Sequence, residues 1–207
     1  MFQIHLSQLT MSCADELYPA LEQIPAMQRR RLSGISRMAL NSAMLCLNHT
    51  HVDYIVWASQ YGDEHKTVQI LQDVLQDLTP SPTQFSTSVH NAVAGLYSIL
   101  CQDATVSTSL CAPWSTALLE AYSYLKIHAP QGKALVVYYD EALPEIYQEY
   151  EDFQGFAMAA CVSLQDADLM IQSGAIQSAN ALPMYHQALD FYHDWQQLTS
   201  QQAKVWP

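Results

Sequence analysis

The chain has 207 residues, half of them hydrophobic, which is enough to fill one sizeable core, so we expect a single domain over residues 1–207. Twenty Asp and Glu residues oppose eight Lys and Arg, and the formal net charge of −12 would repel a phosphate backbone and an anionic membrane surface alike. This composition argues against a nucleic-acid-binding protein.

The beginning of the chain and its cysteines predict a soluble protein of the cytoplasm. The first thirty residues contain no apolar signal region, and the longest apolar run, Phe156 to Val162, is too short to span a bilayer. The odd number of cysteines and their apolar neighbours predict buried, reduced thiols at Cys13, Cys46, Cys101, Cys111 and Cys161. No CxxC pair and no zinc-like spacing of His and Cys occurs, so we expect no metal and no other cofactor.

In chain order, the first predicted element is a helical stretch from Ile24 to Leu47, where apolar residues recur every three or four positions. It includes all four arginines of the chain, Arg29, Arg30, Arg31 and Arg37. In an otherwise acidic chain, this cluster is either a solvated, positively charged helix face or a patch that attracts an anion.

A short buried strand is predicted at Asp53–Ser59, because the segment is rich in β-branched and aromatic residues and is closed by Gly62. Helix periodicity returns over Lys66–Leu78 and again over Val89–Leu100. In the latter helix, Gly95 lets a neighbouring backbone approach closely.

The alternation of strands and helices continues to the end of the chain. Val106–Cys111 has the period of two of a strand with unlike faces, and Thr116–Ile127 is helical. The continuous apolar run of Lys133–Tyr139 suits a strand covered on both faces. Phe156–Leu164 is the last predicted strand, and Pro183–Leu198 is an amphipathic helix. Together these elements predict an α/β sheet.

Two adjoining segments resemble a known enzyme family. Ser86–Ile99, with Asn91 and an Ala-Gly pair, resembles the ketosynthase segment just before the nucleophile. Without a gap, Val106–Cys111 and the helix from Thr116 resemble the strand and helix that flank the catalytic cysteine, where the helix N-terminus stabilises thiolate and oxyanion. The same register places Trp114 at the nucleophile position, and an indole can neither attack a thioester nor carry an acyl group.

Three further segments, 24–33, 57–67 and 81–86, extend the resemblance to the short ketosynthase chain-length factors, which are similar to the amino-terminal half of a β-ketoacyl synthase. The resemblance implies an α/β, thiolase-like fold, N-terminal half only, with its core at about 24–164 and a C-terminal helix at about 183–198. It also implies a full-length ketosynthase and an acyl carrier protein as partners. The implied pathway is aryl polyene biosynthesis or a related polyketide or fatty-acid-like elongation.

The resemblance implies a non-catalytic subunit that shapes the acyl tunnel of its partner, because the family's two catalytic histidines belong to its second half, beyond this chain. Two other functions stay open. One is an independent acyltransferase using Cys111, although packing of Cys111 as a small apolar residue is the favoured interpretation. The other is a structural module that only stabilises a synthase. Ser115 lacks an evident base, and the absence of a GxSxG motif argues against a serine esterase.

The resemblance also assigns residues to sites. Gln84 and Phe85 fall where a ketosynthase inserts residues into the acyl pocket of the other subunit, with Phe85 as a plain core residue an equal alternative. Trp114 either plugs the vacated acyl site or is a core aromatic. The strand that pairs across the dimer axis corresponds to Val106, Ser107, Thr108, Ser109, Leu110 and Cys111. The four arginines form an internal ion-pair cluster, the preferred interpretation, or a docking patch for the acidic carrier protein.

Two plainer expectations concern histidine and tyrosine. His90 is expected to be a buried, hydrogen-bonded imidazole. The tyrosines around the acidic loop 140–152 are expected to be surface and interface packing, although an aromatic wall for a polyene chain would use the same residues, Tyr138, Tyr139, Tyr147 and Tyr150.

Overall fold

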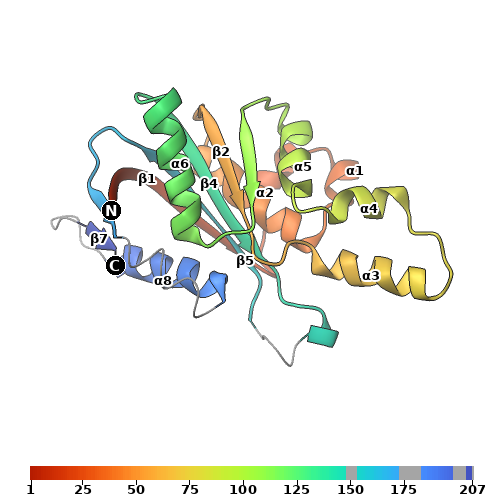
Figure 1. Ribbon diagram of the computed structural model, residues 1–207. Helices are drawn as coiled ribbons and strands as arrows, with labels where there is room; N and C mark the ends of the chain where they lie inside the picture. Colours follow the sequence, from red (N-terminus) through yellow and green to blue (C-terminus); the bar gives the residue numbers. More distant parts are fainter. Residues whose placement is uncertain (148–152, 173–182, 198–203, 207) are drawn as a thin grey trace.

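The computed structural model describes residues 1–147, 153–172, 183–197 and 204–206. One mixed sheet of seven strands runs through it in the order β3-β2-β4-β5-β1-β6-β7 (Figure 1). Its strands are β1 (Phe2–Cys13), β2 (Tyr54–Ala58), β3 (Ser107–Leu110), β4 (Lys133–Asp140), β5 (Phe156–Ser163), β6 (Leu169–Ile171) and β7 (Lys204–Trp206). Strand β2 is parallel to β3 and β4, whereas β5 is antiparallel to both β4 and β1.

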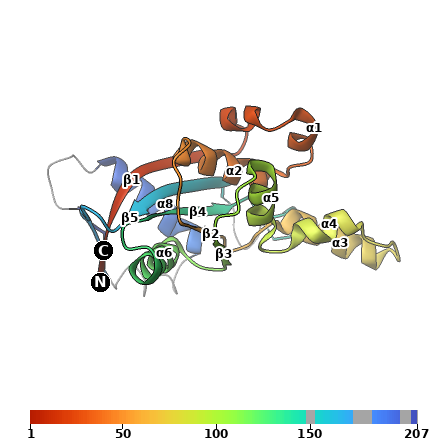
Figure 2. The same cartoon turned by 90° about the horizontal axis from the view of Figure 1, so that it is seen from above.

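Helices cover both faces of this sheet. The helices in the described part of the chain are η1 (Pro19–Gln23), α1 (Ala26–Arg29), α2 (Gly34–Leu47), α3 (Glu64–Leu75), α4 (Pro82–Ser88), α5 (Ala92–Cys101), α6 (Trp114–His128), η2 (Glu145–Tyr147) and α8 (Met184–Gln197), of which α3 and α4 project away from the sheet. Figure 2 shows α2 and α6 on opposite sides of the sheet. No helix in the described part of the chain is both long and apolar enough to cross a membrane.

The two core layers follow from the period of two along each central strand. In β4, Leu135 and Val137 pack with α2 and α5, whereas Val136 and Tyr138 pack with α6 and α8. Because both faces of β4 are covered, the residues that point to either face are apolar, and the apolar run along the strand is therefore continuous. The predicted strand at Lys133–Tyr139, covered on both faces, is therefore confirmed.

Three predictions of the element order need correction. The helix expected over Ile24–Leu47 is interrupted, since α1 ends at Arg29 and α2 begins only at Gly34. Buried Leu32 anchors the intervening turn in the same core cluster as α2. Strand β1 was not predicted, and Phe156–Leu164 is not the last strand, because β6 and β7 follow it.

Helices α3 and α4 project beyond the layered body and form an arm, residues 64–88 (Figures 1 and 2). Neither helix has a buried residue, so the pair packs mainly on itself. The arm and its two connections nevertheless carry large apolar side chains that face solvent: Leu71, Val74, Leu75, Leu78, Phe85 and Val89. The arm is therefore an apolar surface without a cover in the described chain.

Candidate functional site

The candidate site lies where the parallel strands β2, β3 and β4 end. Residues 59–62 follow β2, residues 111–113 lead from β3 into α6, and Glu141 follows β4. The carboxyl ends of parallel strands are the usual place for ligands and reacting groups in open α/β sheets. The resemblance to ketosynthases gives the nucleophile position to Trp114, directly after the second of these segments.

Asp140, the last residue of β4, organises this edge of the sheet. It is fully buried and accepts hydrogen bonds from Ser59 Oγ (2.8 Å), the main-chain N–H of Tyr61 (2.9 Å) and the Tyr138 hydroxyl (2.6 Å). Burial raises the pKa of the Asp140 carboxyl, and these donors oppose that rise. Because its partners all donate to it, Asp140 acts as an anchor for the loop after β2, a role that the sequence did not reveal.

The anchored loop is a tight turn that also holds His90. Ser59 Oγ accepts a hydrogen bond from the Gly62 N–H at 2.7 Å, and Gly62 has a left-handed backbone with φ of 69°. The ring Nε2 of His90 lies 3.2 Å from the Ser59 carbonyl oxygen. His90 is therefore hydrogen-bonded as expected, although it is half-buried and not fully enclosed.

Trp114 is the first residue of α6 and follows directly on the turn after β3. Its side chain is 0% exposed, and its ring lies 5.5 Å from that of Phe191 on α8. The indole Nε1 has no hydrogen-bond partner among the described residues. Helix α6 begins two residues earlier than predicted. The position that the resemblance gives to a nucleophile is occupied by this enclosed aromatic side chain.

Helix α8 closes this position from outside. Its Gln187 Oε1 accepts a hydrogen bond from the Ser115 N–H at 2.9 Å, at the N-terminus of α6. In turn, Gln60 Oε1 accepts one from the Met184 N–H at 2.6 Å, at the N-terminus of α8. Two glutamines thus satisfy helix-start N–H groups and fix α8 over Trp114. Sequence reasoning missed both, because the partners are far apart along the chain.

Cys111, the alternative nucleophile, is exposed. The prediction that it packs as a small apolar residue is therefore wrong. The reason is that β3 lies at the edge of the sheet. Its thiol donates to the Gln60 main-chain carbonyl at 3.5 Å, a group that cannot act as a base.

The other four cysteines were also predicted to be buried. Burial is incomplete at Cys13 and Cys101, whereas Cys46 and Cys161 are buried, and all five thiols are free. Burial raises the pKa of the Cys46 thiol to about 12.

Strand β3 leaves one side open. The carbonyl oxygens of Val106 and Leu110 accept hydrogen bonds from the N–H groups of Ile55 in β2 (3.0 Å) and of Ser59 directly after β2 (3.1 Å). Backbone groups alternate in direction along a strand, so those of Ser107 and Ser109 point away from β2. Val106 is 58% exposed. The segment predicted to be a partner interface is thus an edge strand with unused N–H and C=O groups.

The proposed tunnel residues lie in different parts of the chain. Gln84 and Phe85 are on α4, in the arm, whereas Trp114 is in the core beneath α8. Phe85 is 63% exposed, which excludes the alternative that it is a core residue of this chain.

The preferred interpretation of the arginines is not supported. Arg30 and Arg31 are exposed, Arg29 and Arg37 are half-buried, and within the described ranges none of the four forms a salt bridge with a carboxylate. Three of them line a surface hollow of about 550 Å³ together with Glu16 and Glu22, namely Arg29, Arg30 and Arg37.

The tyrosines also differ from expectation. Tyr138 and Tyr139 are buried on opposite faces of β4, so they belong to the core and not to the surface. Tyr147 is half-buried in η2, and Tyr150 lies outside the described residues.

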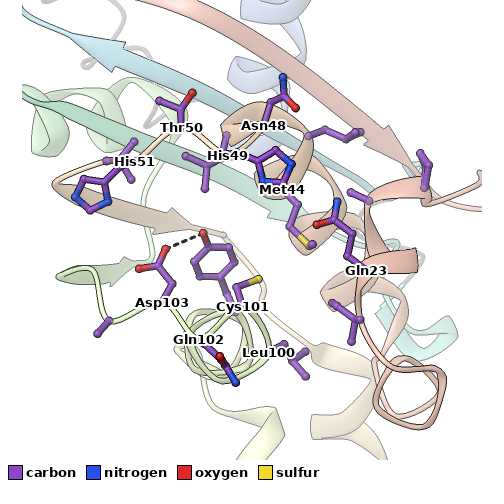
Figure 3. A pocket seen from close by; sticks show the side chains of 18 residues that line it. Gln23, Met44, Asn48, His49, Thr50, His51, Leu100, Cys101, Gln102 and Asp103 are labelled. Atoms are coloured by element: carbon purple, nitrogen blue, oxygen red, sulfur yellow. Dashed lines mark hydrogen bonds between the residues drawn. The ribbon is translucent and has the colours of Figure 1, made fainter.

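A second hollow, of about 730 Å³, lies at the other end of the sheet, between the C-termini of α2 and α5 (Figure 3). Its walls include Asn48, His49, His51 and Cys101, and the Tyr97 hydroxyl donates to Asp103 at 3.0 Å. None of the sequence-predicted site residues lines it. In the described ranges, no cluster of three or more His, Cys, Asp or Glu residues has the arrangement to hold a metal ion.

Comparison with known proteins gives a consistent result. Residues 5–205 match the family model of the β-ketoacyl synthase N-terminal domain. Among solved structures, the chain is similar to one chain of the ketosynthase ApeO in complex with its chain length factor ApeC from Xenorhabdus doucetiae, with 28% identity, a TM-score of 0.69 and coverage of 81% of each chain. No curated protein matches the sequence.

Two more distant structures are synthases of which this chain spans about half. The HMG-CoA synthase PksG from Bacillus subtilis is 14% identical, with a TM-score of 0.48 and coverage of 84% of this chain and 44% of that one. The 3-oxoacyl-[acyl-carrier-protein] synthase III from Aquifex aeolicus VF5 is 16% identical, with a TM-score of 0.45 and coverage of 80% and 55%.

Proposed function

Because this chain belongs to the β-ketoacyl synthase N-terminal domain family, we propose that it is a non-catalytic, chain-length-factor-like subunit that pairs with a full-length β-ketoacyl-ACP synthase. The match to the ketosynthase–chain length factor complex carries this proposal. It covers the same share, 81%, of both chains, so the matched chain is about as long as this one. A subunit of that length corresponds to the amino-terminal half of a β-ketoacyl synthase, as the sequence resemblance implies.

The enclosed start of α6 supports the non-catalytic part of the proposal. In a ketosynthase an acyl thioester must reach a nucleophile at this helix start. Here Trp114 and Ser115 are both 0% exposed, and α8 covers them. The side chains at this position offer an indole, an amide and the Ser115 hydroxyl, none of which forms a thioester.

Two surfaces support the pairing. The open edge of β3 can continue a sheet into a second chain, and such an edge seldom stays uncovered in a native assembly. The apolar side chains of the arm supply the second surface. Figure 2 shows the arm projecting past the side of the body on which β3 lies. One partner that covers both would bury the exposed apolar side chains of the arm and pair the free edge of the sheet.

The exposure of Phe85 favours a role in the partner and not in this chain. A side chain at 63% exposure on a projecting helix cannot line a tunnel within its own subunit, but it can enter that of a neighbour. We assign Gln84 and Phe85 to the far wall of the partner's acyl tunnel, in polyene or related chain elongation. Under this proposal the complex works in the cytoplasm.

Co-expression with a full-length ketosynthase from the same gene neighbourhood tests the pairing. Native mass spectrometry of the purified material should show one copy of each chain in a complex that survives dilution to nanomolar concentration. A chain that remains a stable, well-folded monomer beside the synthase would contradict the proposal. If the two chains co-purify but the synthase makes acyl chains of the same length with and without this subunit, the result would instead favour a structural module that only stabilises the synthase.

A further inference from the structure

The arm joins the body at Asp63, the N-cap residue of α3. The Asp63 carboxylate accepts a hydrogen bond from the Lys66 N–H at 3.3 Å and lies 2.7 Å from Lys66 Nζ. Lys66 Nζ also donates to the carbonyl oxygen of Thr87 at 3.4 Å, near the end of α4. Lys66 thus ties both ends of the arm to a single carboxylate, whose side chain is only 8% exposed.

The segment after β4 meets the same root. His65 Nε2 lies 2.9 Å from the Ala142 carbonyl oxygen, and the preceding residue, Glu141, contacts Asp63. Glu141 Oε1 is buried and has no hydrogen-bond partner in the described ranges. A Cβ added at Gly34 would lie 3.4 Å from Glu141 Oε2, and one at Gly155 would lie 3.0 Å from Glu141 Cα, so close backbone packing holds Glu141 in place.

Charged groups surround Glu141 from several elements. Burial raises the pKa of its carboxyl to about 8, and the Asp63 carboxylate adds to the rise. The Ile35 N–H at the start of α2 and the Lys66 ammonium oppose it. An adjoining hollow of about 390 Å³ holds further ionisable groups, from Asp15, Glu16, Tyr18, Arg37 and His65.

We propose that Glu141 and Asp63 form a proton-dependent latch, in which the protonated Glu141 carboxyl donates its O–H to the Asp63 carboxylate and fastens the arm, and loss of that proton loosens it. A protonated carboxyl donates its O–H to the neighbouring carboxylate, whereas two ionised groups repel each other across one ammonium. The latch would regulate how the arm presents its apolar side chains to a ketosynthase. That consequence rests on the proposed function, but the latch itself does not.

Proton linkage fixes the direction of the effect. When the arm opens, Glu141 becomes solvated and its pKa returns from about 8 toward its ordinary value of 4.5, so opening releases a proton between these pH values. Opening therefore becomes easier as the pH rises through this window. Above about pH 8 both the closed and the open states are ionised, and the pH dependence levels off.

Lys66 provides the reporter, because its ammonium group is held by Asp63 and Thr87 in the closed arm and cleavage by trypsin after it requires local opening of α3. The full-length chain is digested between about pH 6 and 9 beside Glu141→Gln, whose amide donates to Asp63 but does not titrate. Cleavage after Lys126, exposed on α6, is the internal reference. We expect the rate of cleavage after Lys66, expressed as wild type over variant, to rise about fiftyfold between about pH 6 and 8 and to level off above that range.

A ratio independent of pH overturns the latch, as does an equal rise at Lys126, which would report global unfolding. Asp63→Asn is the second variant, because Asn is also a good N-cap residue and removes the repelling charge. It should reduce the pH dependence without abolishing it, because burial alone still raises the pKa of Glu141, and a variant with the full pH dependence of the wild type overturns the proposal. No ketosynthase is present in the digest, so failure of the latch leaves the pairing untouched, and a chain that does not pair can still show the latch.

Discussion

Trp114 is the residue whose replacement most directly addresses catalysis. Trp114→Cys restores a thiol at the start of α6, but we expect no condensation by the isolated chain, because one restored group does not rebuild a catalytic unit. Loss of the fully buried indole beneath Phe191 should lower the free energy of unfolding by about 3–5 kcal/mol. Mass spectrometry of carrier-bound products and urea unfolding measure the two effects. Measurable condensation without a partner would show that the catalytic groups have been misplaced.

Replacement of Phe85 tests its assignment to the far wall of the partner's acyl tunnel, which would limit chain length. Phe85→Ala should leave the isolated chain within about 0.5 kcal/mol of its original stability, since the ring is largely exposed. In the complex it should lengthen the carrier-bound acyl chains, because the far wall of the tunnel recedes. Leu75→Ala is the matched control, as Leu75 is 84% exposed on the same arm. Equal product lengths for both variants and the original complex would contradict the assignment.

Asp140 tests how the site is held together. In Asp140→Asn one acceptor becomes an NH₂ group facing donors from Ser59, Tyr61 or Tyr138. We expect a loss of about 2–4 kcal/mol in the free energy of unfolding, as for a buried charged acceptor that leaves its donors unpaired. Chemical denaturation measures it. Asp103→Asn, a half-buried carboxylate with two donors, is the control and should cost less.

At the scale of the element, β3 offers a test of the edge. Ser109→Pro removes an N–H that points away from β2 and should weaken pairing with the ketosynthase at least about tenfold, because Pro cannot donate to a ladder. Ser109→Ala keeps the N–H and is the control. Titration with the purified synthase gives both dissociation constants. Equal affinities for the two variants would rule out sheet continuation through β3.

The elements also show what the sequence predicts and what it does not. The thiolase-like α/β fold expected from the resemblance is confirmed by the family match, and β2, β4, α5 and α6 lie within a few residues of their predicted ranges. Strand β1 was missed although Phe2, Ile4 and Leu6 alternate with polar residues, which is the signal that should have revealed it. Periodicity reports burial within one element, and the break before α2 depends on tertiary packing of Leu32.

The candidate site was predicted less completely than the fold. The register placed Trp114 in the turn between a strand and a helix predicted to begin at Thr116, and in the structure Trp114 is the first residue of α6. The anchoring by Asp140 and the two glutamine caps, Gln60 and Gln187, join segments that are 72 to 124 residues apart. No periodicity or local motif encodes such contacts, so only the folded structure reveals them.

At the scale of the whole molecule, both faces of the sheet are covered by this chain alone. Helix α8 covers α6 on one face, and α2 with α5 covers the other. Phe191 joins α8 to Trp114 and, with ring centroids 4.9 Å apart, to Trp206 in β7. In the described ranges, each face of the sheet thus has its own hydrophobic core cluster.

Charge distribution is the other property of the whole molecule. A chain with net charge −12 carries all its arginines in residues 29–37, unpaired with carboxylates in the part that the structure describes, and we propose this stretch as the docking patch for the acidic carrier protein. The double variant Arg30→Glu, Arg31→Glu should weaken carrier binding about tenfold at low salt and flatten its salt dependence. Lys126→Glu is the control, because Lys126 is also an exposed basic residue and lies on α6. Calorimetric titration at two salt concentrations decides, and equal binding by both variants contradicts docking.

The open edge of β3 has a consequence for how the cell supplies this subunit. A copy made without its partner exposes both a free strand edge and the apolar arm, the features that lead to edge-to-edge aggregation. Chaperones and proteases continuously sort chains that expose such surfaces. Under the proposed pairing, copies without a partner are removed, so the steady-state amount of the subunit follows the supply of its partner and not its own rate of synthesis.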